Sequence, residues 1–176
     1  MLEEVFGLLF VTIWFYLPAA AANMAPVLVT WIPFEKPIWE SKLGKNKTWR
    51  GFVVGVIVAI VVVSIQKSFS TFVSISKDFF STLYENNTFV IGLLVGAGAL
   101  LGDSVKSFFK RKCGIASGER WWPFDQIDFI LGSTVFVSVI FFPGCGVVLF
   151  ALLLTMFIHP FINKIGFALG LKKVPW

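Results

Sequence analysis

The sequence is poor in charge and in the side chains that bind transition metals. Charged residues make up 14% of its 176 residues and hydrophobic residues 57%, and the chain contains 1 His and 2 Cys. So few charges exclude an ordinary water-soluble domain, in which about a quarter of the residues are charged. The two cysteines, Cys113 and Cys145, lack a metal-binding spacing and fall on opposite sides of the membrane in the topology derived below, so we expect no disulfide.

The abundance of apolar side chains predicts an all-α integral membrane protein. The mean hydropathy is +0.84, and the chain contains 21 Phe and 7 Trp. Each membrane-spanning helix needs about 20 apolar residues, so about four to six spans fit into this length. No room remains for a separate soluble domain, and we expect residues 1–176 to form a single transmembrane domain.

Five stretches without charged residues predict the membrane-spanning helices. The first contains Pro18 and Pro26 and is longer than one perpendicular crossing requires, so it is expected to be tilted or broken. The last two are separated by a Pro-Gly-Cys-Gly turn and predict a helical hairpin. Apolar residues near helical spacing over 68–83 predict a helix in the membrane interface. The five predicted spans are 5–34, 51–66, 86–102, 129–142 and 147–162.

The distribution of Lys and Arg orients this five-span chain. With an odd number of spans, 13 of the 15 basic residues fall on one side of the membrane, and only Lys67 and Lys77 fall on the other. Because basic loops remain in the cytoplasm, the N-terminus is predicted outside and the C-terminus inside the cell. We therefore expect a multi-pass protein of the cell membrane whose charged segments, and any active site among them, face the cytoplasm.

A basic segment leads into the second span. Lys and Arg neutralise phosphoryl oxygens, and a Gly-containing turn at a helix start adds backbone N–H donors. The segment therefore predicts phosphate binding, although an ordinary positively charged loop has the same composition. The residues assigned to phosphate binding are Lys45, Lys47, Thr48, Arg50 and Gly51.

A second segment combines cations with carboxylates. Asp103 follows the Gly-rich third span, and Asp125 and Asp128 share one face at the start of the fourth. Carboxylates at membrane depth are costly and mark function by default. Without His or Cys partners they are hard oxygen ligands, suited to magnesium held together with substrate phosphates. The structural alternative is that Asp125 caps a helix and the carboxylates pair with nearby Lys and Arg.

Three features inside the spans have more than one interpretation. Asn23, a strong amide in the first span, either lines a cleft of the cofactor site or bonds to a neighbouring helix. The Gly-rich stretch 92–98 allows close helix packing, either within the chain or between two copies in a homodimer. His159 lies near the cytoplasmic end of the last span and is expected at the interface.

Three short motifs in these segments carry a family resemblance. Lys47-Thr48-Trp49-Arg50-Gly51 resembles a Lys-Thr-x-Glu-Gly element with Arg in place of Glu. A Gly-Asp-x-x-x-Ser-x-x-Lys-Arg element is matched over 102–111, and residues 125–128 resemble Asp-Arg-x-Asp with Gln in place of Arg. In this order the elements resemble the CTP-dependent phosphatidate cytidylyltransferase (CDP-diacylglycerol synthase) superfamily. The short chain resembles most its archaeal branch, the CDP-archaeol synthases.

The resemblance implies a reaction and a set of roles. CTP and an isoprenoid ether lipid phosphate would give a CDP-activated lipid and pyrophosphate, with Mg²⁺ as cofactor. The magnesium would be held by Asp103, Asp125 and Asp128. The triphosphate or the lipid phosphate would be contacted by the basic segment together with Ser107 and the catalytic Lys110 and Arg111.

Other functions fit the sequence less well. A CDP-diacylglycerol synthase acting on phosphatidate would use the same residues. A CDP-alcohol phosphotransferase would require an Asp-Gly-x-x-Ala-Arg motif, which the sequence lacks. A small anion transporter would place its site near the bilayer midplane within inverted repeats, and no repeat is found. The partners expected besides CTP and the lipid phosphate are membrane lipids, and no nucleic acid is expected.

Overall fold

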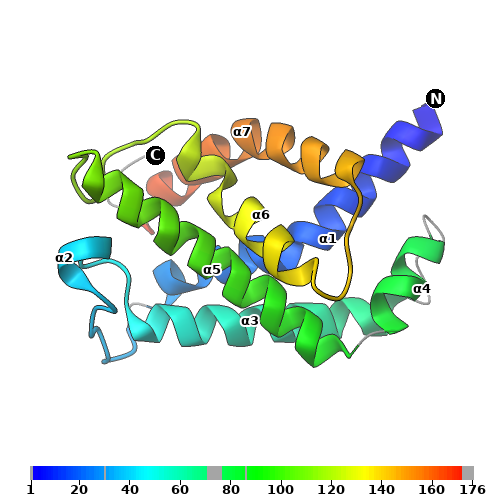
Figure 1. Cartoon of the computed structure of the whole chain (residues 1–176), viewed down its shortest axis with the longest axis horizontal. Coiled ribbons are helices and arrows are strands. Elements are labelled where there is room, and N and C mark those ends of the chain that lie inside the picture. Colours follow the sequence, from blue (N-terminus) through cyan, green and yellow to red (C-terminus); the bar gives the residue numbers. More distant parts are fainter. Residues whose placement is uncertain (1, 30, 71–76, 86, 172–176) are drawn as a thin grey trace.

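Helices form all the regular structure in the part of the chain that is described. The computed structural model describes residues 2–29, 31–70, 77–85 and 87–171. Within these ranges no β-strand forms, which agrees with the all-α prediction. The helices are α1 (Leu2–Leu28), α2 (Glu40–Leu43), α3 (Trp49–Phe69), α4 (Lys77–Glu85), α5 (Thr88–Lys112), α6 (Phe124–Val137) and α7 (Cys145–Ala168) (Figure 1).

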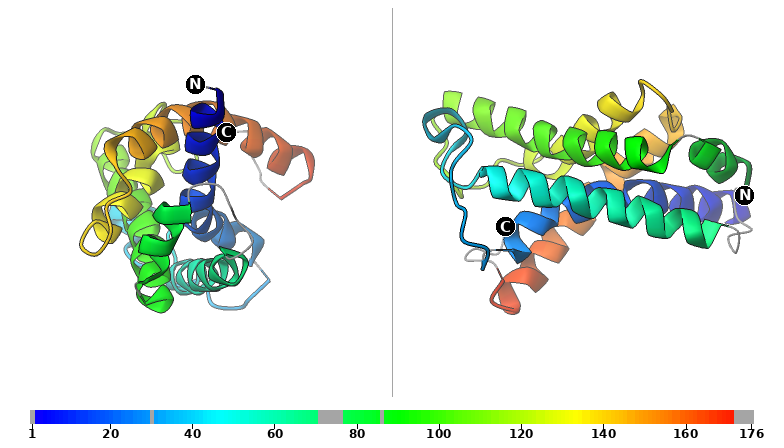
Figure 2. Two further views of the ribbon diagram at one scale, coloured as in Figure 1. Left: turned by 90° about the vertical axis from the view of Figure 1, so that its right-hand side faces the viewer. Right: turned by 90° about the horizontal axis from the view of Figure 1, so that it is seen from below.

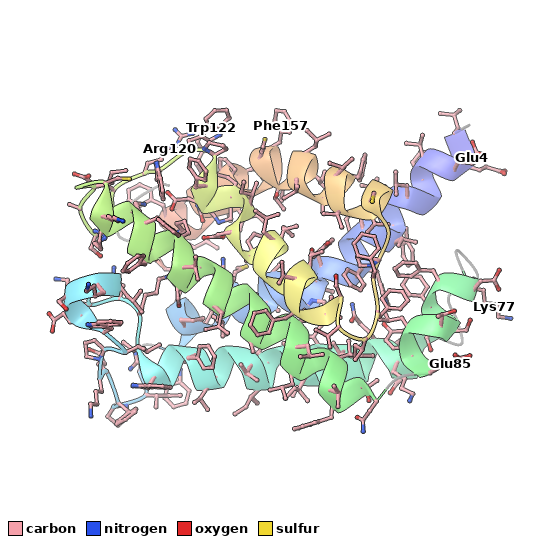
Figure 3. The ribbon with its side chains drawn as sticks, viewed as in Figure 1. Glu4, Lys77, Glu85, Arg120, Trp122 and Phe157 are labelled. Atoms are coloured by element: carbon pink, nitrogen blue, oxygen red, sulfur yellow. The ribbon has the colours of Figure 1, made fainter. Side chains whose placement is uncertain are left out.

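Four of these helices, α1, α3, α5 and α7, are long and apolar enough to cross a membrane. Their outward faces are apolar, as expected for a protein dissolved in lipid. On α3 Val53 and Ile57 are exposed, and on α7 Leu153 and Phe157 are exposed. Phe157 is labelled on the outer side of α7 in Figure 3. The remaining predicted span corresponds to α6, which has 14 residues. At 1.5 Å per residue it measures about 21 Å, which is shorter than the roughly 30 Å hydrocarbon core.

Two helix boundaries differ from the prediction. α1 continues through Pro18 and Pro26, so the predicted break is absent, and the helix ends at Leu28 instead of reaching residue 34. α5 continues past its predicted end at residue 102 as far as Lys112. The prediction ended this helix before Asp103, because hydropathy falls at the first charged residue. Lys and Arg are good helix formers, so the helix continues. The helix ends before Gly114, whose φ of +76° suits a left-handed cap.

The predicted interfacial helix is found in part. Residues 77–83 belong to α4, while residues 71–76 lie outside the described ranges. α4 buries Phe80 and Leu83 against the bundle. The hydroxyl of Tyr84 accepts a hydrogen bond from Trp14 Nε1 at 2.9 Å. Burial raises the pKa of Tyr84 to about 12, so this hydroxyl remains neutral.

The bundle is built around α1. This helix packs against α3, α5, α6 and α7, and the left view of Figure 2 shows it between α3 and α7. The hydroxyls of Tyr16 and Thr134, which are 2.7 Å apart, join α1 to α6. α6 and α7 also pack against each other.

The two ends of the bundle carry different side chains. In Figure 1 α2, the end of α5 and the start of α6 lie at one end, while α4 and the first turn of α1 lie at the other. Arg120 and Trp122 mark the first end in Figure 3, and Glu4, Lys77 and Glu85 mark the second. The two charged segments selected from the sequence are therefore at the same end.

Glycines bring α5 and α6 into unusually close contact. A Cβ added at Gly102 would lie 2.3 Å from the backbone oxygen of Asp128. A Cβ added at Gly132 would lie 2.1 Å from the oxygen of Gly98 and 2.8 Å from Gly102 Cα. Small residues are the usual means of close helix approach in membranes. The Gly-rich face is therefore used within the chain, and the contact places Asp128 beside the polar part of α5.

We expect Gly132→Ala to destabilise the fold. The added methyl group meets backbone atoms that cannot move without separating α5 from α6, and overpacking of this kind typically costs about 1–3 kcal/mol. Thermal unfolding of the detergent-solubilised protein measures the effect. Gly146→Ala is the matched control, because nothing lies within 4 Å of a Cβ at that helical position. Equal unfolding temperatures for the two variants would contradict this account of the packing.

Candidate active site

The extension of α5 places three charged side chains on one helix face. Asp103, Lys106 and Lys110 follow one another at i, i+3 and i+7, which is the spacing of such a face. Asp103 and Lys110 are buried, and the Lys106 side chain is only 14% exposed. Buried charges of this kind persist only when partners of opposite charge lie close to them.

Lys106 lies at the centre of the carboxylate cluster. Its Nζ is 3.1 Å from Asp103 Oδ1, 2.7 Å from Asp125 Oδ1 and 3.0 Å from Asp128 Oδ2. The three carboxylates selected from the sequence therefore surround one point. Lys106 itself was not selected, although its i, i+3 spacing from Asp103 is a signal that could have identified it.

Two more lysines balance the charge of the cluster. Lys47, which precedes α3, forms an ion pair with Asp103 Oδ2. Lys110 Nζ lies 3.0 Å from Asp125 Oδ2 and also donates to the backbone oxygen of Glu119. Three carboxylates thus face three ammonium groups. The charge pairing that the structural alternative predicts is therefore present. It does not by itself exclude a chemical role for the cluster.

Backbone donors fix the two carboxylates of α6. The N–H of Trp121 donates to Asp125 Oδ2 at 2.5 Å, and the N–H of Phe129 donates to Asp128 Oδ1 at 2.6 Å. Asp125 does not act as the N-cap, since that position is Pro123, which makes no side-chain capping bond. The carboxylate of Asp125 instead accepts the N–H of Trp121, which lies just before the helix, so a capping role for Asp125 rests on this contact and not on the N-cap position.

A polar cavity of about 160 Å³ adjoins the cluster at the start of α3. Lys47, Thr48 and Gly51 of the first motif line it together with Asp103 of the second, so folding brings the two motifs together. Asn23 of α1 lines the same cavity. Asn23 therefore places part of the first span beside the two charged segments.

Local geometry explains why Thr48 and Gly51 occupy the cavity wall. Thr48 is the N-cap of α3, and its Oγ1 accepts a hydrogen bond from the N–H of Gly51 at 3.1 Å. A Cβ on Gly51 would lie 2.9 Å from Pro26 Cβ, so the glycine allows α1 to approach the start of α3.

Arg50 has a different environment from its neighbours. Its guanidinium donates to the backbone oxygen of Ile32 and lies 3.2 Å from Glu35 Oε1. Both partners belong to the connection between α1 and α2. Arg50 therefore holds that connection against α3 and does not line the polar cavity.

The other predicted residues are not among those that line the cavity. Lys45 is exposed in the turn after α2, and Ser107 is buried on α5. Arg111 is half-buried, and its Nε has no hydrogen-bond partner in the described part of the chain. Asn46, which the sequence analysis did not select, lines the cavity and donates to Ser117 Oγ at 3.4 Å. No sequence signal distinguishes Asn46 from its neighbours.

The carboxylates have the donor chemistry of a magnesium site, with ammonium groups between them. Among the described residues, no three His, Cys, Asp or Glu side chains are grouped closely enough to hold a metal ion. The three carboxylates lie 2.7–3.1 Å from Lys106 Nζ, whereas Mg²⁺–oxygen distances are about 2.0–2.1 Å. Three carboxylates around one point offer the oxygen ligands that magnesium prefers. Binding would require the carboxylates to move inward and Lys106 to withdraw.

The fold and the site together define a class of protein. Buried carboxylates and cations beside a polar cavity are the kinds of side chain that enzymes of phosphate chemistry use. They lie at one end of a helix bundle with an apolar outer surface. This combination is that of an integral-membrane enzyme that acts on phosphorylated substrates.

Comparison with known proteins identifies the family. A family model described as CarS-like CDP-archaeol synthase matches residues 5–176, so the chain belongs to the CDP-archaeol synthase family. The CDP-archaeol synthase of Methanospirillum hungatei is 38% identical over 141 residues, covering 76% of this chain and 81% of the relative. The CDP-archaeol synthase of Thermococcus kodakarensis is 33% identical, covering 96% of each chain.

A solved structure supports the same conclusion. It is described as that of an intramembrane enzyme for archaeal membrane lipid biosynthesis. It matches with a TM-score of 0.66 at 25% identity, covering 86% of this chain and 91% of the other. The resemblance carried by the three motifs is confirmed, and the protein is a membrane enzyme of lipid synthesis.

We expect Lys106→Met to destabilise the protein. The substitution leaves three carboxylates around an apolar side chain, and removal of one partner from a buried ion pair costs about 3–5 kcal/mol. Chemical or thermal unfolding in detergent with EDTA measures the loss. Lys112→Met is the control, since Lys112 is exposed in the last turn of the same helix. If both variants unfold like the parent protein, Lys106 does not hold the cluster together.

Proposed function

We propose that the protein transfers the cytidylyl group of CTP to 2,3-bis-O-(geranylgeranyl)-sn-glycerol 1-phosphate, giving unsaturated CDP-archaeol and pyrophosphate. The observation that carries this proposal is the match to the CDP-archaeol synthase family over residues 5–176. The site supports it independently, because the residues that match the superfamily motifs gather around one polar cavity and one carboxylate cluster.

The reaction needs no nucleophile from the protein. An oxygen of the lipid phosphate forms a bond to the α-phosphorus of CTP. The bond between that phosphorus and the oxygen bridging to the β-phosphorus breaks, and pyrophosphate leaves with the electron pair. A phosphate monoester is already largely ionised at neutral pH, since its second pKa is about 6. The chain's residues therefore have to bind, orient and neutralise the two phosphorylated substrates.

We assign this task to the polar and basic residues near the cavity and at the end of α5. Lys47 and Thr48 line the polar cavity and would contact the triphosphate there. Lys110 and Arg111, at the end of α5, would contact the leaving pyrophosphate or the lipid phosphate. Ser107 lies on the same helix between them and Asp103. Arg50 acts indirectly in this scheme, because it orders the connection before α2.

Magnesium would be held by Asp103, Asp125 and Asp128. When bound, a divalent cation would supply positive charge that neutralises the phosphate groups of the substrates. The surrounding residues have a complementary role. The ammonium groups of Lys47, Lys106 and Lys110 keep the carboxylates together in a buried place until substrate phosphates are present.

We propose five crossings with the site facing the cytoplasm of the cell membrane. α6 runs back from the charged end and α7 returns toward it (Figure 1), which supports α6 as a short fifth crossing. Basic residues of the segments 35–50 and 103–128 lie at that same end, and the positive-inside rule then places it in the cytoplasm.

We expect pyrophosphate release to require both substrates. The purified protein in detergent with Mg²⁺ should release pyrophosphate with CTP and the geranylgeranyl ether lipid phosphate together, and not with either alone. ATP in place of CTP, and phosphatidate in place of the ether lipid, are the comparisons. Release with phosphatidate at equal efficiency would assign the protein to diacylglycerol chemistry. No release with any nucleotide would refute a cytidylyltransferase.

We expect Asp103→Asn to reduce turnover by at least about a hundredfold, since one ligand of the divalent cation and one partner of Lys47 are lost together. The matched control is Asp78→Asn, an exposed carboxylate on α4 at the opposite end of the bundle. Calorimetric titration with Mg²⁺ in the presence of CTP provides a readout separate from activity. Full magnesium-dependent turnover of Asp103→Asn would show that the metal assignment is wrong.

A further inference from the structure

One lysine of the charged cluster differs from the other two in the number of carboxylates that it contacts. Lys47 forms an ion pair with Asp103, and Lys110 forms one with Asp125. Lys106 pairs with all three carboxylates, at N–O distances between 2.7 and 3.1 Å. An ammonium group has three N–H donors, so one donor is available for each carboxylate. Lys106 therefore occupies the point around which the carboxylates gather.

A divalent cation held by the same three carboxylates would compete with Lys106 for their oxygens. The place is nearly enclosed, since the Lys106 side chain is 14% exposed and the Asp128 side chain is 3% exposed. Like charges repel strongly where water is largely excluded. The ammonium of Lys106 and a metal ion therefore cannot share this point, and one has to leave for the other to bind.

A displaced Lys106 ammonium would need a new anion. A buried charge without a partner is costly, and metal binding would occupy the three carboxylates that now surround Nζ. The four-carbon stem of lysine is flexible, so Nζ can move while the backbone stays in α5. The polar cavity beside Asp103, which Lys47 and Thr48 also line, is where a nucleotide phosphate would bring negative charge.

The charge balance of the cluster leads to the same conclusion. Three aspartates face three lysines, so the cluster is neutral as it stands. Binding of a divalent cation alone would leave an excess of positive charge in a nearly enclosed place. A nucleotide triphosphate brings several negative charges at neutral pH. Metal and nucleotide together can restore the balance, whereas the metal alone cannot.

We propose that Lys106 is an internal counter-ion that keeps the divalent cation out of the carboxylate cluster until the nucleotide arrives. Its ammonium then moves from the carboxylates to a phosphoryl oxygen of the nucleotide. The inference rests on the proposed function for the identity of the nucleotide. It adds a residue that lies outside the recognised motif, because position 106 is a variable position of the Gly-Asp-x-x-x-Ser-x-x-Lys-Arg element.

Metal binding without nucleotide tests this inference. The probe is Mn²⁺ alone, titrated into the full-length protein in detergent, with free Mn²⁺ followed by electron paramagnetic resonance. We expect Lys106→Gln to bind Mn²⁺ at least about tenfold more tightly than the parent, because no ammonium repels the cation at that point. Lys106→Arg keeps the charge and should show no gain in affinity.

Lys110→Gln is the matched control, because it removes the same charge from the same cluster and leaves Lys106 at the centre. Its gain in Mn²⁺ affinity should stay below about threefold. Equal gains in Lys106→Gln and Lys110→Gln would show that net charge alone sets the metal affinity, and would overturn the inference. Binding of Mn²⁺ to the parent with a micromolar Kd would also overturn it, and that measurement needs no variant.

Thermal unfolding provides a second readout without nucleotide. Mg²⁺ should raise the unfolding temperature of Lys106→Met by about 5 °C, since the metal replaces the missing positive charge and binds only the folded state. The parent should shift by less than about 1 °C under the same conditions. Equal shifts of parent and variant would contradict the exclusion of the metal by Lys106.

Turnover separates this inference from the proposed function. Lys106→Gln should raise KM for CTP by about tenfold, because a charge-assisted contact with a phosphoryl oxygen is lost. Lys112→Gln, at an exposed position of the same helix, should keep the KM of the parent. An unchanged KM in Lys106→Gln would refute the movement of Lys106 to the nucleotide. Failure of the parent to release pyrophosphate would instead refute the proposed reaction, and the Mn²⁺ titration would still decide whether Lys106 excludes the metal.

Discussion

Mutual neutralisation of buried charges is the condition on which the rest of the site depends. An isolated ion moved out of water in a protein loses several kcal/mol even after relaxation. Asp103, Asp125 and Asp128 avoid this cost because Lys47, Lys106 and Lys110 lie against them. The charged side chains come from three separate segments. If one segment moved away, charged side chains of the others would lose their partners. The cluster therefore joins α3, α5 and α6 at the end of the bundle where the polar cavity lies.

The close contact of α5 with α6 makes this neutralisation possible. Lys106 and Asp128 meet only because the backbones approach at Gly102 and Gly132, where no Cβ would fit. Small residues and buried ions are thus two parts of one arrangement. A larger residue at either glycine would separate the ions as well as the helices, so packing and chemistry cannot be varied independently here.

Much of this arrangement could be predicted from the sequence, and the exceptions have physical causes. The uncharged runs predicted the long helices, and the cost of intramembrane carboxylates selected Asp103, Asp125 and Asp128. Hydropathy failed at the end of α5, because it measures preference for solvent and not the ability of Lys and Ser to continue a helix. It therefore left Asp103, Lys106 and Lys110 together in a loop, and their common face becomes visible only when the helix is extended.

The same limits apply to the side chains of α1 and α7. Asn23 and His159 each stood alone in an apolar run, and a sequence does not show which neighbour such a residue faces. In the structure both line an apolar cavity between α1 and α7, and Asn23 lines the polar cavity as well.

The two departures from the superfamily motifs become understandable in terms of charge. Arg50 replaces a Glu of the motif, yet it adds no cation to the cluster because it is bonded to Ile32 and Glu35. Gln126 replaces an Arg and is 3% exposed, with no partner for its Oε1 in the described chain. Neither departure therefore adds a cation to the cluster, in which three lysines balance three aspartates.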